Sequence, residues 1–200
     1  METSKEQLDN LMKIKGEVRG AVFQTDAEYV RIKKGGRGLV LVQEELKKLG
    51  HPIDYASIKA TEWYPLGLRA ISLLTIKKVF DWDDRDIEEM GNAAPKYSFI
   101  VRLLMKYFLT FPMSYKQSPA YWKKHYTVGK FKTPGYDLNK KYYIARLEDF
   151  KVHPILCVYL GGYFMRIGQF VLKEAKNFKV KETKCMFRGD SGHEFVITYE

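Results

Sequence analysis

The chain has 200 residues, 46% hydrophobic and 14% aromatic, which is enough apolar material for a buried core and a length typical of one domain. Charged residues make up 29%, and the sequence contains no low-complexity segment, which excludes an intrinsically disordered chain. Lys and Arg exceed Asp and Glu by ten (34 minus 24). A basic balance of this kind fits nucleic acid, an anionic membrane or an acidic partner, and does not choose among them.

The start of the chain lacks the basic and then apolar pattern of a secretory signal, so a cytoplasmic location is expected. The longest apolar run, residues 99–109, is interrupted by Arg102 and Lys106, whereas a membrane span needs about 20 residues with few charges. This run is therefore expected to be a core helix, and no integral membrane segment is predicted. In a reducing compartment the two cysteines, Cys157 and Cys185, favour free thiols or metal ligands over a disulfide.

The first half of the sequence predicts mainly helices. Thr3 and Glu6 have the spacing of a capping box, which indicates a short amphipathic helix within residues 1–16 that could contact a second subunit. A strand is expected next, and then helices with apolar periodicity or an acidic first turn. The expected ranges are a strand over 18–23 and helices over 26–34, 38–49, 66–80, 81–91, 99–109 and 118–126.

The last third predicts strands around one long helix. Strands are expected over 129–131 and 142–147, a helix from Pro154 to about Ala175, and a final hairpin of strands over 178–187 and 193–199. Residues 17–200 are thus predicted to form one α/β (α+β) domain, in which a helical layer packs on an antiparallel sheet that ends in a C-terminal β-hairpin.

Gly161 and Gly162 lie inside the helix predicted from Pro154, where each costs about 1 kcal/mol relative to Ala. Either the close approach of a neighbouring backbone or a bound ligand would compensate for this cost. Backbone packing is the preferred explanation, and a ligand flanked by Tyr159 and Tyr163 is the alternative.

Lysines alternate with aromatic residues between residues 115 and 141, a composition that also occurs on nucleic-acid-binding surfaces. Aromatic residues at this spacing more often form core while the lysines face solvent, so nucleic-acid binding is ranked low. The residues are Tyr115, Lys116, Tyr121, Trp122, Lys123, Lys124, Tyr126, Lys130, Phe131, Lys132, Tyr136, Lys140 and Lys141.

Potential metal ligands gather in the last third of the chain. Cys185 and His193 are separated by seven residues about a turn centred on Gly189, so they could lie opposite each other on a hairpin, with Cβ atoms roughly 5 Å apart. Cys157 could add a third ligand from the preceding helix, and Glu182 or His153 a fourth, completing a zinc site. The alternative is a buried thiol beside an exposed histidine.

The order of several segments resembles the 4-vinyl reductase domain and its uncharacterised bacterial relatives. The segments are Glu62-Trp63-Tyr64-Pro65-Leu66, residues 121–126, His153-Pro154-Ile155-Leu156-Cys157 with Gly161-Gly162-Tyr163, and residues 185–195. The resemblance covers residues 17 to 200. It implies the fold shared by haem nitric-oxide-binding domains and TRAPP vesicle-tethering subunits, often with an apolar cavity and with dimerisation.

The resemblance also bears on cofactors. In phenol-sensing activators of this family a zinc is held by one Cys, a Glu, a second Cys three residues later and a third Cys eight residues after the second. Glu182, Cys185 and His193 fall on the last three of these positions, with His replacing Cys, and Cys157 is near the first. A regular strand would place Glu182 and Cys185 on opposite faces, so Glu182 can join only at a bend or bulge. No Tyr-x-Ser-x-Arg signature occurs, so no haem is expected.

These observations predict a non-catalytic sensory or regulatory domain that binds a small apolar molecule and forms a homodimer. No nucleophile with its base, paired carboxylates or cofactor loop is recognised. A TRAPP-like interaction scaffold is the alternative, followed by a nucleic-acid-binding protein. The expected ligand-binding residues are Trp122, Tyr126, Tyr159, Gly162 and Tyr163, and the expected ligands of a possible structural zinc are Cys157, Glu182, Cys185 and His193.

Overall fold

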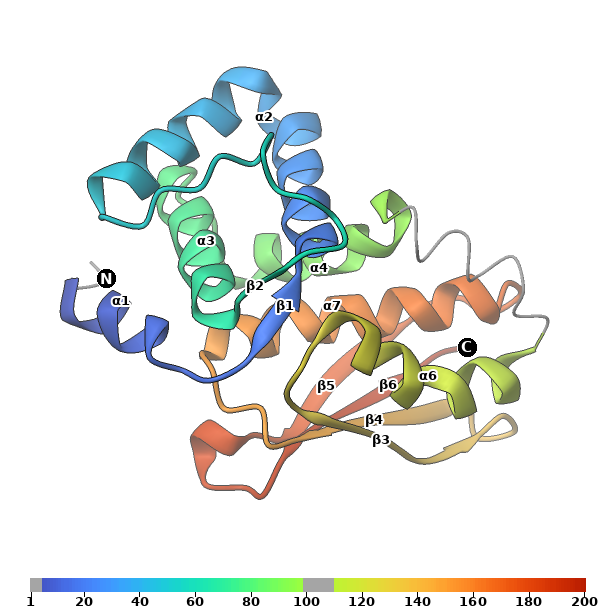
Figure 1. The fold of residues 1–200 in the computed structure, drawn as a ribbon. Coiled ribbons are helices and arrows are strands. Elements are labelled where there is room, and N and C mark those ends of the chain that lie inside the picture. Colours follow the sequence, from blue (N-terminus) through green and yellow to red (C-terminus); the bar gives the residue numbers. More distant parts are fainter. Residues whose placement is uncertain (1–4, 99–109) are drawn as a thin grey trace.

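The computed structural model describes residues 5–98 and 110–200, and it shows a mixed α/β fold in tiers (Figure 1). The helix predicted over residues 99–109 lies outside the described residues. The elements, in chain order, are α1 (Lys5–Met12), β1 (Glu17–Arg19), α2 (Gly20–Lys48), β2 (Trp63–Pro65), α3 (Leu66–Val79), α4 (Asp84–Tyr97), α6 (Phe111–His125), β3 (Lys130–Asp137), β4 (Tyr142–Glu148), α7 (Pro154–Val171), β5 (Lys179–Lys184), the 3-10 turn η1 (Met186–Arg188) and β6 (His193–Thr198).

The sheet is antiparallel, with strand order β3-β4-β6-β5, so the C-terminal hairpin completes it as predicted. Buried and more exposed residues alternate along β4 and β6, which gives the sheet one face directed toward the core. Helices α6 and α7 cover this face, and α2, α3 and α4 lie beyond α7 (Figure 1). The predicted class, a helical layer on an antiparallel sheet, is confirmed.

The N-terminal half differs in detail from the prediction. Helix α2 begins at Gly20, inside the strand expected over 18–23, and it joins the two predicted helices across a kink at Gly35, whose φ is +72°. The backbone of Gly35 is not helical, so two helical segments meet at this kink, as the sequence predicts, and the positive φ is accessible to glycine without steric cost. Gly91 does not end α4, which continues to Tyr97, while Asp83 and Asp86 form a capping box at its start.

Helix α1 packs on the same chain. Leu8 and Leu11 are buried, and a Cβ on Gly67 of α3 would lie 2.0 Å from the backbone oxygen of Leu11. The apolar face of α1, which suggested a subunit contact, is therefore covered by α3. The homodimer stays a prediction without this support.

Helix α7 is the central helix of the domain. Among the described residues it is the one helix long and apolar enough to cross a membrane, but half of it is buried inside this fold. It packs most extensively against α4 and also contacts β5 and β6 on its other side. Helix α7 is apolar because it is packed between α4 on one side and the sheet on the other.

The contact between α4 and α7 is made by backbone atoms. A Cβ on Gly162 would lie 2.0 Å from the backbone oxygen of Glu88, and a Cβ on Gly91 would lie 1.9 Å from that of Tyr159. Each glycine thus admits the backbone of the other helix. This confirms backbone packing as the reason for Gly162, whereas Gly161 would meet only Phe195 and Val180 at 3.7 Å.

We expect Gly162→Ala to lower the free energy of unfolding by about 2 kcal/mol or more, because the methyl group forces two helices apart. The melting temperature should fall by roughly 4–8 °C. Gly161→Ala is the matched control, and it should be neutral or stabilising by up to about 1 kcal/mol, since Ala favours the helix and meets ordinary contacts. Thermal and chemical unfolding measure both variants, and equal effects would contradict the backbone contact.

Candidate functional site

The structure brings together the four residues predicted to bind metal. The ligand atoms of Cys157, Glu182, Cys185 and His193 all lie within 4.8 Å of one another. Cys157 belongs to α7, Glu182 to β5, and His193 begins β6, while Cys185 directly follows β5. His193 and Cys185 are buried, at 2% and 5% exposure. Segments distant in sequence thus converge at one end of the sheet.

A β-bulge admits Glu182 to this cluster. The pairing of β5 with β6 shifts between Glu182 and Lys184, so the strand departs from regular alternation at this point. The side chain of Glu182 reaches Nδ1 of His193 at 3.0 Å. The sequence-based requirement for a bulge is therefore met.

The ring of His193 is oriented with one nitrogen toward the cluster. Its Nε2 lies 3.2 Å from the backbone oxygen of Phe150, and since a carbonyl only accepts, Nε2 carries the proton of this hydrogen bond. Nδ1 faces the cluster, 3.4 Å from Sγ of Cys157 and 3.0 Å from Oε1 of Glu182. In the protonated ring Nδ1 donates to the Glu182 carboxylate, and in the neutral ring it presents a lone pair to a metal ion. Metal-binding histidines commonly donate their other nitrogen in this way.

The cluster's electrostatics fit a cation. Burial raises the pKa of Cys157, and the charge of Glu182 raises it further. Burial would also raise the pKa of Glu182, but hydrogen bonds from His193 and Cys185 lower it overall, so the carboxylate is ionised at neutral pH. Two thiols, an imidazole nitrogen and a carboxylate are a donor set that suits a tetrahedral metal ion.

His153, the alternative fourth ligand, lies outside the cluster. Its Nδ1 accepts a hydrogen bond from the backbone N–H of Ile155 at 3.1 Å, so the residue caps the N-terminus of α7. Burial lowers its pKa, with a smaller contribution from Lys77.

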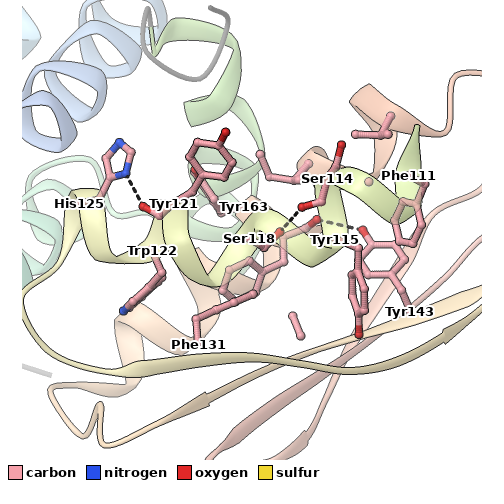
Figure 2. Close-up of a pocket in the computed structure, with 15 residues that line it drawn as sticks. Phe111, Ser114, Tyr115, Ser118, Tyr121, Trp122, His125, Phe131, Tyr143 and Tyr163 are labelled. Atoms are coloured by element: carbon pink, nitrogen blue, oxygen red, sulfur yellow. Dashed lines mark hydrogen bonds between the residues drawn. The ribbon is translucent and has the colours of Figure 1, made fainter. Parts of the chain in front are cut away.

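A second feature is an apolar cavity of about 100 Å³ between α6, α7 and the sheet (Figure 2). Hydroxyl groups on its α6 wall are engaged: Ser118 donates to the backbone oxygen of Ser114, and Ser114 to that of Thr110. Aromatic side chains dominate the wall. The described lining residues are Phe111, Ser114, Tyr115, Ser118, Tyr121, Trp122, His125, Phe131, Tyr143, Ala145, Tyr163, Phe164, Ile167, Gly168 and Val171.

A smaller cavity of about 70 Å³ adjoins the first and is lined by residues of α2, α3, α4, α6 and α7. The two cavities share four lining residues: Tyr121, Trp122, His125 and Tyr163. The wall of the smaller cavity includes polar side chains, those of Arg69, Tyr126 and Tyr159. We call the first the aromatic cavity and the second the arginine cavity.

The predicted ligand-binding residues are distributed between these cavities. Trp122 and Tyr163 line both, while Tyr126 and Tyr159 line only the arginine cavity. Gly162 lines neither and contacts α4 instead. Trp122 and Tyr126 stack with their ring centres 4.1 Å apart, and the lysines interleaved with these aromatic residues are exposed.

His125 offers a second available imidazole nitrogen. Its Nδ1 lies 3.1 Å from the backbone oxygen of Tyr121, so Nδ1 carries the proton and Nε2 has the lone pair in the neutral ring (Figure 2). Burial lowers its pKa, which keeps the ring neutral at pH 7.

The sequence did not reveal the buried polar network of the arginine cavity. Arg69 of α3 and Asp26 of α2 are 1% and 0% exposed, and Nε of Arg69 lies 3.4 Å from Oδ2 of Asp26. The hydroxyl of Tyr159 donates to Oδ1 of Asp26 at 2.6 Å, and Arg69 also donates to the hydroxyl of Tyr126. The available signal was Arg69 itself, a charged residue within the otherwise uncharged stretch from Leu66 to Ile76.

No family model and no curated protein match the sequence. Solved structures do match. An H-NOX protein from S. oneidensis in the Fe(II)NO ligation state covers 91% of this chain and 99% of its own, with 13% identity and a TM-score of 0.64. An oxygen-binding H-NOX domain related to soluble guanylate cyclases covers 91% and 95%, with 12% identity and a TM-score of 0.64. The chain therefore has the H-NOX fold, while the narrower resemblance to the 4-vinyl reductase domain stays a prediction.

The comparisons correct the cofactor expectation. We expected no haem and a possible structural zinc, but the neighbours include H-NOX proteins described by their Fe(II) state and by haem distortion. The absence of the Tyr-x-Ser-x-Arg signature was therefore insufficient ground for expecting no haem in a chain with this fold. In the present chain Nε2 of His125 would be available to bind a haem iron, but the aromatic cavity, at about 100 Å³, is smaller than the roughly 300–1,000 Å³ of typical ligand sites. A porphyrin does not fit unless the surrounding helices separate.

We expect the cluster of Cys157, Glu182, Cys185 and His193 to bind one Co²⁺ per chain, with an absorption band from thiolate ligation. Cys185→Ser should weaken Co²⁺ binding by at least about tenfold, equivalent to about 1.4 kcal/mol, because it removes one of the four ligands. His153→Ala is the control, because His153 lies outside the cluster, and it should retain the band. Absence of the band in the unaltered protein would show that the cluster is not a metal site.

Proposed function

We propose that this chain is a non-catalytic sensory domain whose aromatic cavity binds a small apolar molecule. The H-NOX fold supports this proposal, since solved domains with that fold are described as binding NO or oxygen. The identities of 10–15% support likeness of fold alone, so the ligand must be argued from the residues of this chain.

The observation that carries the proposal is the aromatic cavity itself. Protein interiors are close-packed, so a cavity of about 100 Å³ lined by aromatic rings between helices and the sheet is a candidate binding site. An engineered apolar cavity of about 150 Å³ binds benzene, which sets the scale of a suitable ligand at one ring. The adjoining arginine cavity adds room for a substituent.

The chemistry of the lining supports binding rather than catalysis. The described lining of the aromatic cavity contains no carboxylate and no thiol, and the hydroxyls of Ser114 and Ser118 donate to helix carbonyls. His125 is the one imidazole of this lining, and its Nδ1 is bonded to backbone. A nucleophile with an adjacent base is thus missing from the described wall.

We further propose that the cluster of Cys157, Glu182, Cys185 and His193 serves structure. Four protein ligands would leave a bound metal ion no open position for water. The ion would join α7 to β5 and β6 and so hold the hairpin against the helix that forms one wall of the aromatic cavity.

We expect ethylbenzene to bind the unaltered protein and Ser118→Leu to weaken this binding by at least about tenfold, because the larger side chain fills the aromatic cavity. Gln117→Leu is the matched control: it makes a similar change at the adjacent, exposed position of α6. Isothermal titration calorimetry measures both variants. Equal affinities for both would place the binding elsewhere, and no binding to the unaltered protein would contradict the proposed function.

A further inference from the structure

The arginine cavity identifies a chemical feature of the ligand, provided that the aromatic cavity binds small molecules as proposed. We infer that the ligand is an apolar molecule with one neutral hydrogen-bond acceptor, such as a ketone or aldehyde carbonyl. The apolar body lies in the aromatic cavity, and the carbonyl accepts from Arg69 in the arginine cavity.

Arg69 has donors to spare. A guanidinium carries five N–H donors, and those of Arg69 with a partner point to Asp26 and Tyr126. Its second terminal nitrogen has no hydrogen-bond partner among residues 5–98 and 110–200, although the side chain is 1% exposed. Arg69 lines the adjoining cavity, so an acceptor on a ligand there would give this nitrogen a hydrogen-bond partner.

The charge of Arg69 is already balanced. Asp26 is fully buried 3.4 Å from it, and the hydroxyl of Tyr159 donates to the other carboxylate oxygen. A carboxylate ligand would add a second negative charge to a buried volume that contains one positive charge. A neutral acceptor uses the free donors without adding charge.

The two cavities adjoin. They share Tyr121, Trp122, His125 and Tyr163, which form their common wall, and the inference requires that the substituent of a ring lying against Phe131 and Tyr143 pass Trp122 to reach Arg69. The aromatic cavity is lined by aromatic rings, and the arginine cavity includes a guanidinium. An aryl group in the first and a carbonyl in the second would match these linings.

Four probes of one size test the inference by calorimetry: ethylbenzene, acetophenone, 1-phenylethanol and benzoate. We expect acetophenone to bind at least about tenfold tighter than ethylbenzene, equivalent to about 1.4 kcal/mol, and tighter than the other two. Ethylbenzene binding as tightly as acetophenone, or benzoate or the alcohol binding most tightly, would overturn the inference while leaving the cavity a binding site. If none of the probes binds, the proposed function itself fails.

The variant Asp26→Leu/Arg69→Met tests whether Arg69 causes the preference for acetophenone over ethylbenzene. Removing both charges avoids leaving either one buried alone, and an apolar pair of similar size is often tolerated. Ethylbenzene should bind this variant as before, and the preference for acetophenone should vanish. Tyr55→Phe is the control, because it removes another buried hydroxyl, bonded to Ser72 outside both cavities, and should keep the preference. A preference that survives the double substitution would overturn the role of Arg69.

A spectroscopic measurement covers the case in which the double variant does not fold. In the unaltered protein, acetophenone should shift the side-chain ¹⁵N and ¹H resonances of Arg69, whereas ethylbenzene should leave them in place. Equal shifts with both probes would contradict a hydrogen bond from Arg69 to the carbonyl.

Discussion

The backbone contact between α4 and α7 is the constraint on which both candidate sites depend. Gly91 and Gly162 allow the two helices to touch at the backbone, and this fixes the height and rotation of α7. From that position one helix supplies Cys157 to the metal cluster, Tyr159 to the buried network and Tyr163 to both cavities. A shift of α7 would therefore disturb all three at once.

The buried network plays a comparable role beside this contact, since Tyr159 takes part in both. Asp26, Arg69, Tyr126 and Tyr159 come from α2, α3, the end of α6 and α7, so four segments meet at one ion pair. A buried ion pair contributes little net stability, but any arrangement that leaves one of its charges buried without the other is strongly destabilised. The network thus favours one arrangement of the helices around the arginine cavity, and a ligand bonded to Arg69 would act directly on the group that unites them.

Local sequence signals predicted the C-terminal half well. Proline at a helix start, alternating strands and the spacing of Cys185 and His193 about a turn are determined within a few residues, and the structure has the corresponding hairpin and cluster. The need for a bulge at Glu182 followed from the alternation of a strand alone. The sequence could not show which atoms approach Gly91 or Gly162, because that depends on a helix about seventy residues away. The buried network of Arg69 was missed because its partner Asp26 lies 43 residues away in the sequence.

The central claim is that a small apolar molecule enters the space between α6, α7 and the sheet. Mapping of backbone amide shifts by NMR during titration with ethylbenzene tests it most directly. The account predicts the largest shifts at Ser118, Tyr163 and Gly168, whose segments line the aromatic cavity, with small shifts on the exposed face of α6. Shifts centred on any other surface, or none at a saturating concentration, would contradict it.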